Sequence, residues 1–266
     1  MNEKQLNKIS RLKYLRTVAL YILRLTARDI EFKNPYTQQK IKVNSYKHKG
    51  YWFFRGYREE ATTASMKRLV KDGSTVIEVG GHIGFISHLY SWLVGEKGKL
   101  FVFEPGDNNL NYTRNNLSML KNTVLVEKAC GNVNGILSFF KDGISGQNNS
   151  LLRDYENVEG VAASHGTKAE RVETKVDVIR LEDFISAEDI IVNHVKIDVE
   201  GAEKDVLLGL NSYLGKIPSF MIEITRNAED VYSLMRANGY LAYDDNLNLL
   251  SNRDLRNGNV FFVLHQ

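Results

Sequence analysis

The chain has few of the residues that mark secreted, fibrous and metal-cluster proteins. Its 266 residues include one cysteine, three prolines and twenty glycines. A lone thiol, Cys130, excludes an intramolecular disulfide and a Cys-x-x-Cys metal cluster, so no oxidising compartment is implied. The low proline content excludes a collagen-like or low-complexity chain. The remaining composition, 43% apolar and 25% charged, is that of an ordinary globular protein.

Long apolar runs are also missing. The longest one near the start, from Tyr14 to Leu25, contains Arg16 and Arg24, which argues against a membrane span or a secretory signal. Apolar residues of this region instead recur at the spacing of an amphipathic helix, which packs on the protein body or lies on a membrane. They are Leu12, Leu15, Ala19, Ile22 and Leu23. We expect a cytoplasmic protein in which this segment allows peripheral membrane contact.

Acidic residues are scarce in residues 1–55, which hold thirteen Lys and Arg against three acids, although the whole chain has a net charge of only +3. A basic extension on an acidic body suggests an anionic partner, either a membrane surface, a polyanionic glycan or nucleic acid. Pairing with the chain's own acidic body is an equally good explanation. No nucleic-acid partner is predicted, because no basic patch with interleaved aromatic residues occurs outside residues 42–55.

From residue 75 onward, buried strand patterns alternate with helical ones, which predicts a doubly wound α/β domain with a mostly parallel sheet. Two closing strands predict an antiparallel C-terminal edge. We expect an extension at 1–56, a domain at 57–266, and an inserted, polar loop region at about 141–172, which is either an acceptor-binding loop or lid, or a solvated or disordered loop. Strands are expected at 41–46, 75–79, 100–103, 123–128, 136–140, 175–181, 195–199, 219–224, 240–243 and 260–264, and helices at 58–70, 83–94, 109–120, 202–210 and 230–238.

The first buried strand runs into Gly80, Gly81 and Gly84, a pattern typical of a nucleotide cofactor site. These glycines do not have the G-x-G-x-x-G spacing of a dinucleotide site. Glu78 precedes them, where its charge would repel a pyrophosphate and favour the cationic end of S-adenosylmethionine. Capping of the glycine turn by Glu78 is the structural alternative.

Other candidate cofactor contacts follow neighbouring strands. Glu104 ends the second buried strand, where a carboxylate accepts hydrogen bonds from both ribose hydroxyls. Ala129 and Cys130 are expected to form small walls for an adenine, which makes Cys130 a packing residue. Glu59, before the first strand, is a candidate for the amino-acid end of the cofactor or a residue of a charged helix surface.

Three motifs together resemble the FkbM methyltransferase family over about residues 57–225: Glu78 to Gly84, Phe103-Glu104-Pro105, and Val195 to Glu203. The resemblance implies a class I methyltransferase, Rossmann-like fold, S-adenosylmethionine as methyl donor, and transfer to oxygen. It also implies small-molecule acceptors or sugars of surface polysaccharides. The chain departs from the family where Glu78 replaces a more usual Asp and His82 a common Asn.

The methyl acceptor is expected to be a hydroxyl of a small molecule or glycan. Asp198, at the end of the fourth strand, is the first choice for the general base, with helix capping as the alternative. His82 beside the cofactor is a second catalytic candidate or a packing residue. Substrate-binding candidates are Gln147, Asn148, Asn149, Glu200 and Glu223. No metal is predicted, because two carboxylates without a third ligand are weak evidence for one.

Two other functions fit the same pattern less well. A nicotinamide-dependent oxidoreductase conflicts with the glycine spacing and with Glu78. A non-catalytic cofactor-binding protein would keep the pocket and use its basic extension to dock a polyanion.

Overall fold

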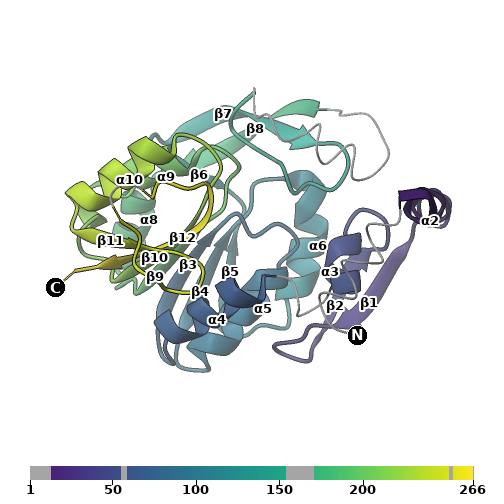
Figure 1. Ribbon diagram of the computed structural model, residues 1–266, viewed down its shortest axis with the longest axis horizontal. Coiled ribbons are helices and arrows are strands. Elements are labelled where there is room, and N and C mark those ends of the chain that lie inside the picture. The colour runs from purple at the N-terminus through teal and green to yellow at the C-terminus, as the bar shows by residue number, and fades with distance from the viewer. Residues whose placement is uncertain (1–12, 55–58, 154–170, 252–253, 266) are drawn as a thin grey trace.

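A seven-stranded sheet forms the centre of the molecule in this computed structural model, which describes residues 13–54, 59–153, 171–251 and 254–265 (Figure 1). The strand order is β11-β12-β10-β9-β3-β4-β5, and all neighbours pair in parallel except β12, which runs antiparallel to β10 and β11. The predicted doubly wound fold with an antiparallel C-terminal edge is therefore confirmed. The strands are β3 (Thr75–Val79), β4 (Lys99–Phe103), β5 (Thr123–Val126), β9 (His194–Ile197), β10 (Ser219–Ile224), β11 (Tyr240–Tyr243) and β12 (Gly258–Leu264).

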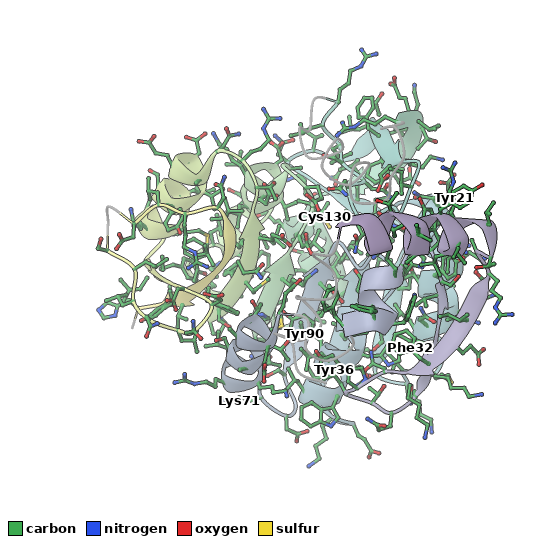
Figure 2. All side chains as sticks on the ribbon, turned by 45° about the vertical axis from the view of Figure 1, so that its right-hand side comes forward. Tyr21, Phe32, Tyr36, Lys71, Tyr90 and Cys130 are labelled. Atoms are coloured by element: carbon green, nitrogen blue, oxygen red, sulfur yellow. The ribbon has the colours of Figure 1, made fainter. Side chains whose placement is uncertain are left out.

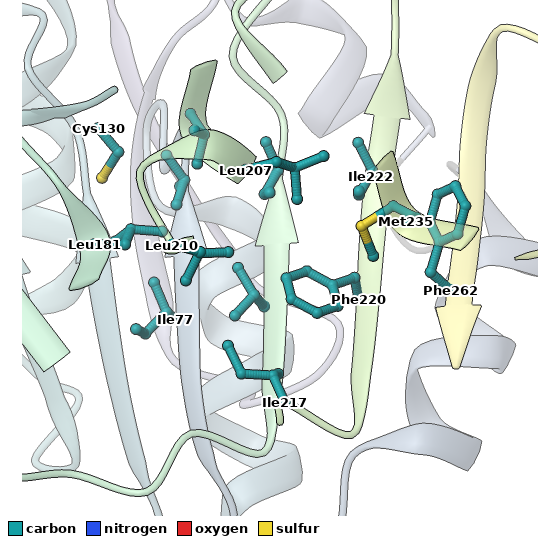
Figure 3. Packing of buried hydrophobic residues seen from close by; sticks show 14 of the residues in the cluster. Ile77, Cys130, Leu181, Leu207, Leu210, Ile217, Phe220, Ile222, Met235 and Phe262 are labelled. Carbon is teal, nitrogen blue, oxygen red and sulfur yellow. The ribbon is translucent and has the colours of Figure 1, made fainter. Parts of the chain in front are cut away.

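Helices cover both faces of this sheet because successive residues of each central strand point to opposite faces. Ile77 and Val79 of β3 pack in one apolar cluster with α8, α9 and α10, whereas Val76 packs in another with α4, α5 and α6. Figure 3 shows the first cluster, where Leu207 and Leu210 face Ile77 and Phe220 across the helix–sheet interface. The helices are α4 (Glu60–Leu69), α5 (Phe85–Val94), α6 (Asp107–Leu117), α8 (Leu181–Glu188), α9 (Glu203–Leu208) and α10 (Ala228–Ala237).

Two smaller sheets flank this core. The strands β6 (Ala129–Cys130), β7 (Gly135–Asp142) and β8 (Arg171–Ile179) form a three-stranded sheet at one end of the molecule. Next to α5 and α6, the N-terminal part contributes α2 (Lys13–Leu25), the hairpin of β1 (Asp29–Lys33) and β2 (Lys40–Asn44), and the short helix α3 (Lys49–Phe54).

The N-terminal hairpin packs on the domain through aromatic contacts with α5. The rings of Phe32 and Tyr36, labelled in Figure 2, lie with their centroids 6.4 Å and 6.2 Å from that of Phe85. Ile41, Val43 and the Phe85 ring belong to one buried apolar cluster. The extension and the α/β domain therefore share a core here. The predicted boundary at 56/57 and positions 154–170 of the predicted loop region lie outside the described residues.

Sequence patterns located most central strands within one or two residues, but several elements differ. Residues 181–188 form α8, for which no helix was predicted, and β8 begins at Arg171, four residues before the predicted strand. The helix predicted at 202–210 begins at Glu203, so Glu200 lies in a preceding turn with φ of 55° and not in a first helical turn. The hairpin strand β1 was also not predicted.

Candidate active site

The site lies where the strand order reverses, between β3 and β9, the place where parallel α/β sheets bind ligands beyond the carboxyl ends of their strands. A cavity of about 270 Å³ opens there. Twelve of the fifteen predicted site residues line it: Glu59, Gly80, His82, Glu104, Ala129, Cys130, Gln147, Asn148, Asn149, Asp198, Glu200 and Glu223. The other three, Glu78, Gly81 and Gly84, lie outside its lining.

The glycines that follow β3 are required by packing of the chain on itself. Gly80 has a φ of 87°, and a Cβ atom there would lie 1.8 Å from the backbone oxygen of Asp198. The N–H groups of Gly80 and Gly81 both donate to the carbonyl of Phe103, each at 3.0 Å. These contacts bring the ends of β3, β4 and β9 together, so the glycines build the cavity floor without having to contact a ligand.

Glu78 does not occupy the role that the sequence suggested. Its side chain is buried: Oε2 accepts a 2.6 Å hydrogen bond from Ser87, and Oε1 lies 3.5 Å from the ammonium of Lys196. A direct contact between this carboxylate and a cationic cofactor is therefore wrong, because the protein itself supplies both partners. Capping of the glycine turn is wrong for the same reason.

Hydrogen bonds fix the carboxylate of Glu104 at the cavity wall and leave it able to accept a hydrogen bond from a ribose hydroxyl. Its Oε2 accepts from the N–H of His82 at 2.8 Å, and its Oε1 accepts from the N–H of Gly106 at 2.9 Å and from Asn109 at 3.1 Å. Burial raises the pKa of Glu104 to about 7, although these hydrogen bonds oppose the shift. Each carboxylate oxygen offers two lone-pair directions, so at least one stays available on Oε2 for a hydroxyl donor from the cavity.

His82 links three segments of the chain above the cofactor end of the cavity. Its Nε2 lies 3.0 Å from the carbonyl of Ser145 and must donate to it, so in the neutral ring Nδ1 accepts from the Tyr51 hydroxyl at 3.0 Å. Gln147 in turn donates to that hydroxyl at 3.1 Å. His82 has a φ of 48°, a conformation that Asn, Asp and His adopt more readily than other side chains. These contacts indicate a packing and orienting residue more than a proton carrier.

The three predicted amides of the loop differ in what they offer a ligand. Asn149 uses its side chain within the protein, accepting from the N–H of Asp142 at 2.9 Å and donating to Asn108 at 2.8 Å. Gln147 is engaged with Tyr51. Asn148 is 3% exposed and lines the cavity, yet its amide has no hydrogen-bond partner within the described part of the chain. Its amide atoms are not among the fully buried polar atoms that lack a partner, so they are open to the cavity, where they can bind a ligand.

Asp198 and Glu223 lie side by side in the cavity lining, beyond the ends of β9 and β10. Ile197 pairs in register with Ile222, so the next residues on β9 and β10 bring the two carboxyl groups together. The charge of Asp198, followed by burial, raises the pKa of Glu223 to about 9, and the carboxylates of Glu200 and Glu59 add to this effect. Glu223 therefore carries a proton at neutral pH.

The ammonium of Lys196 lies against one member of this pair, Asp198. Its ammonium donates to Oδ2 of Asp198 and to the carbonyl of Gly80, both at 3.1 Å, and is almost fully buried. Burial lowers the pKa of Lys196, but the carboxylates of Asp198 and Glu78 outweigh it and hold this pKa above its usual value. The ammonium therefore stays charged and lies against the carboxyl group of Asp198.

Helix capping by Asp198 is wrong, because α9 begins five residues later and Ala202 occupies its N-cap position. Glu200 instead anchors the loop, its carbonyl accepting a 2.7 Å hydrogen bond from Ser150. No group of three or more His, Cys, Asp or Glu side chains placed to hold a metal ion occurs among the residues with described positions.

The lining charges fit S-adenosylmethionine better than a dinucleotide. Five carboxyl groups line the cavity, against two lysines, Lys128 and Lys196; one of the five, Glu223, is protonated at neutral pH, and the other four supply the negative charge. Such a surface attracts a sulfonium and an ammonium group and repels a pyrophosphate. The electrostatic preference predicted from Glu78 therefore holds for the cavity as a whole, although other acids produce it. Burial raises the pKa of Cys130, which keeps this thiol neutral beside the cavity.

Two residues of the site were not predicted from the sequence. Tyr51 belongs to an aromatic run in the extension, and only folding brings it next to His82. The sequence pattern includes Lys196 only as part of the Val195 to Glu203 motif. A single lysine in a buried strand could have predicted an ion pair at this position, because a buried ammonium requires an acidic partner.

Comparison with known proteins agrees with this geometry. Residues 78–242 match the methyltransferase FkbM domain family. A protein named Methyltransferase 1 from Beauveria bassiana (strain ARSEF 2860) is 29% identical over 150 residues, which cover 53% of this chain and 59% of that protein.

Solved structures with a similar fold include fibrillarin from Aeropyrum pernix with natively bound S-adenosyl-L-methionine (TM-score 0.46, 11% identity, 88% of each chain). Another is a SAM-dependent O-methyltransferase from Thermotoga maritima (TM-score 0.42, 12% identity, 78% of this chain and 65% of that one). The family match spans more than half of the sequence. The chain belongs to the FkbM methyltransferase domain family, and its cofactor is S-adenosylmethionine.

Proposed function

We propose that this protein is an O-methyltransferase that transfers the methyl group of S-adenosylmethionine to a hydroxyl group, most favourably one of a sugar in a glycan or glycosylated metabolite. The observation that carries the proposal is the pair of Asp198 and Glu223 in the cavity lining. Of these two carboxyl groups, Asp198 is the one that is ion-paired with the Lys196 ammonium. The proposal is supported by a protonated Glu223 beside a carboxyl group that has a permanently charged ammonium against it.

The two carboxyl groups suit a hydroxyl acceptor. A sugar hydroxyl is barely acidic and needs a general base as its oxygen attacks. When bound, the cofactor supplies an electrophilic methyl group on sulfur. Asp198 would accept the hydroxyl proton as the methyl group passed from sulfur to the acceptor oxygen, and the cofactor would depart as a neutral thioether. Protonated Glu223 donates a hydrogen bond that orients the acceptor or a neighbouring oxygen.

The lining polar groups favour a polyhydroxylated acceptor over an apolar one. Asn148 presents both an amide donor and an acceptor, and Glu200 adds a carboxylate to the same cavity. Vicinal hydroxyls are bound by such mixed donors and acceptors, whereas an apolar acceptor would leave them buried and unpaired. Positioning of the hydroxyl in line with the methyl group and sulfur supplies much of the remaining rate enhancement.

The test is a labelled-methyl transfer assay over a panel of sugars, oligosaccharides, phenolic or aliphatic alcohols, amines and thiols. Asp198→Asn keeps the size of the side chain but removes the base, so transfer should fall by about 10²–10⁴-fold with cofactor affinity retained. Asp230→Asn, a surface aspartate paired with Lys204, is the matched control and should transfer normally. Methylation of an amine or thiol in preference to every hydroxyl would contradict the proposal. Equal transfer by Asp198→Asn and wild type would contradict the role of Asp198.

A further inference from the structure

The amphipathic N-terminal helix α2 keeps one apolar face uncovered by the described residues. Val18, Tyr21, Ile22 and Leu25 are 45%, 65%, 54% and 68% exposed. Their spacing of three, four and seven residues places all four on one side of the helix. Contiguous apolar surface of this kind marks an interaction site more often than isolated exposed residues do.

The opposite side of α2 faces the protein. Leu20 and Leu23 are the half-buried residues of the helix whose side chains are described, and they lie about half a turn away from the exposed face. Figure 1 shows α2 at the periphery, apart from the seven-stranded sheet, and Figure 2 shows Tyr21 on this outer helix. The body thus holds the helix by one face and presents the other outward.

The N-terminal segment that contains this helix is strongly basic in sequence. Residues 1–55 contain thirteen Lys and Arg but three acids. Two of these acids are already paired, Asp29 with Lys42 at 3.0 Å and Glu31 with Lys40 at 3.5 Å. Arg24, Arg28 and Lys33 have no carboxylate partner in the described ranges, so their charges face outward uncompensated.

We propose that α2 docks the protein on an anionic membrane surface, with its exposed apolar residues in the boundary between headgroups and acyl chains and its basic residues against lipid phosphates. Nucleic acid or a polyanionic glycan would use the positive charge but not the apolar face. A second copy of the chain would use the apolar face but would bring two strongly basic segments together. An anionic bilayer satisfies both features. None of the described helices is long and apolar enough to cross a membrane.

The experiment is flotation of the full-length protein with vesicles of phosphatidylcholine alone or with about one third phosphatidylserine. Binding is expected on the anionic vesicles and should weaken in high salt. The double variant Ile22→Glu/Leu25→Glu should reduce the bound fraction by roughly tenfold, because it places two charges at the apolar boundary. Ile191→Glu is the matched control: this isoleucine is 84% exposed, lies outside the N-terminal segment, and should leave flotation unchanged. Unchanged cofactor affinity and melting temperature would show that each variant is folded.

Three results would overturn the proposal. One is equal binding of wild type and the double variant to anionic vesicles. Another is tight binding to heparin or RNA that the apolar substitutions do not affect, with no flotation of wild type. The third is a dimer in solution that the double variant dissociates, again with no flotation. The outcome is independent of which acceptor is methylated, since vesicle binding is measured without the reaction.

Discussion

Replacing Lys196 by Met tests the electrostatic centre of the site. The ammonium lies 3.1 Å from Oδ2 of Asp198. At an effective dielectric constant of about 20, two unit charges at this distance attract by about 5 kcal/mol. Water entering the vacated space reduces the effect. We therefore expect Lys196→Met to move the acidic limb of the kcat/KM profile to higher pH.

Transfer at pH 7 should therefore fall, by up to about tenfold, and activity should partly recover as the pH rises. The assay is initial-rate methyl transfer from pH 5 to about 10, together with cofactor affinity by calorimetry. Lys204→Met, which removes an exposed lysine paired with Asp230, is the control and should keep the wild-type profile.

The variant also leaves Glu78 buried without its cation, which costs stability by itself. The double variant Glu78→Gln/Lys196→Met removes both charges and should regain most of the melting temperature. It should not regain activity at neutral pH, because Asp198 still lacks its counter-charge. A Lys196→Met enzyme with the wild-type acidic limb, or a double variant with normal activity, would refute the reasoning.

Two further predictions concern residues of the cavity lining. Asn148→Ala removes a buried amide that no described residue satisfies, so it should raise the KM for the acceptor by about tenfold with little change in stability; an unchanged KM would show that Asn148 does not contact the acceptor. Glu223→Gln should mimic the protonated acid. Because the pKa of Glu223 is raised to about 9 from its usual 4.5, its stabilising contribution is present at low pH and is lost as the pH rises toward 9. The melting temperature of Glu223→Gln minus that of wild type should therefore increase between pH 5 and 9, and a flat difference would contradict the assignment.

The sequence patterns located the fold well because buried strands and glycine turns are local signals. Thr75–Val79 and Lys99–Phe103 are short β-branched or aromatic runs bounded by turn residues, and both became central parallel strands. Asp29–Lys33 alternates charged and apolar residues on an exposed hairpin and was missed. The strand ends also predicted that Asp198 and Glu223 share one edge, since parallel strands end on the same side of a sheet.

Contacts between distant segments were not predictable in the same way. Tyr51 reaches His82 across 31 residues, and Gln147 reaches Tyr51 across 96, so no local spacing links them. The resembling family commonly has Asn at position 82. Asn and His both tolerate a positive φ, so this exchange is compatible with the φ of 48° that His82 adopts. It did not indicate that the histidine ring would connect the extension to the loop.

The error about Glu78 had a different cause, and the sequence contained the information to avoid it. Glu78 is the one charged residue of β3, and Lys196 is the one charged side chain among the last three residues of β9. Both strands are buried on both faces, where an unpaired charge is strongly destabilising. Two opposite charges, each in the last three residues of adjacent parallel strands, should be expected to face each other. The structure pairs them in register, with Glu78 opposite Lys196. A charge inside a buried strand should therefore be assigned to a protein partner before it is assigned to a ligand.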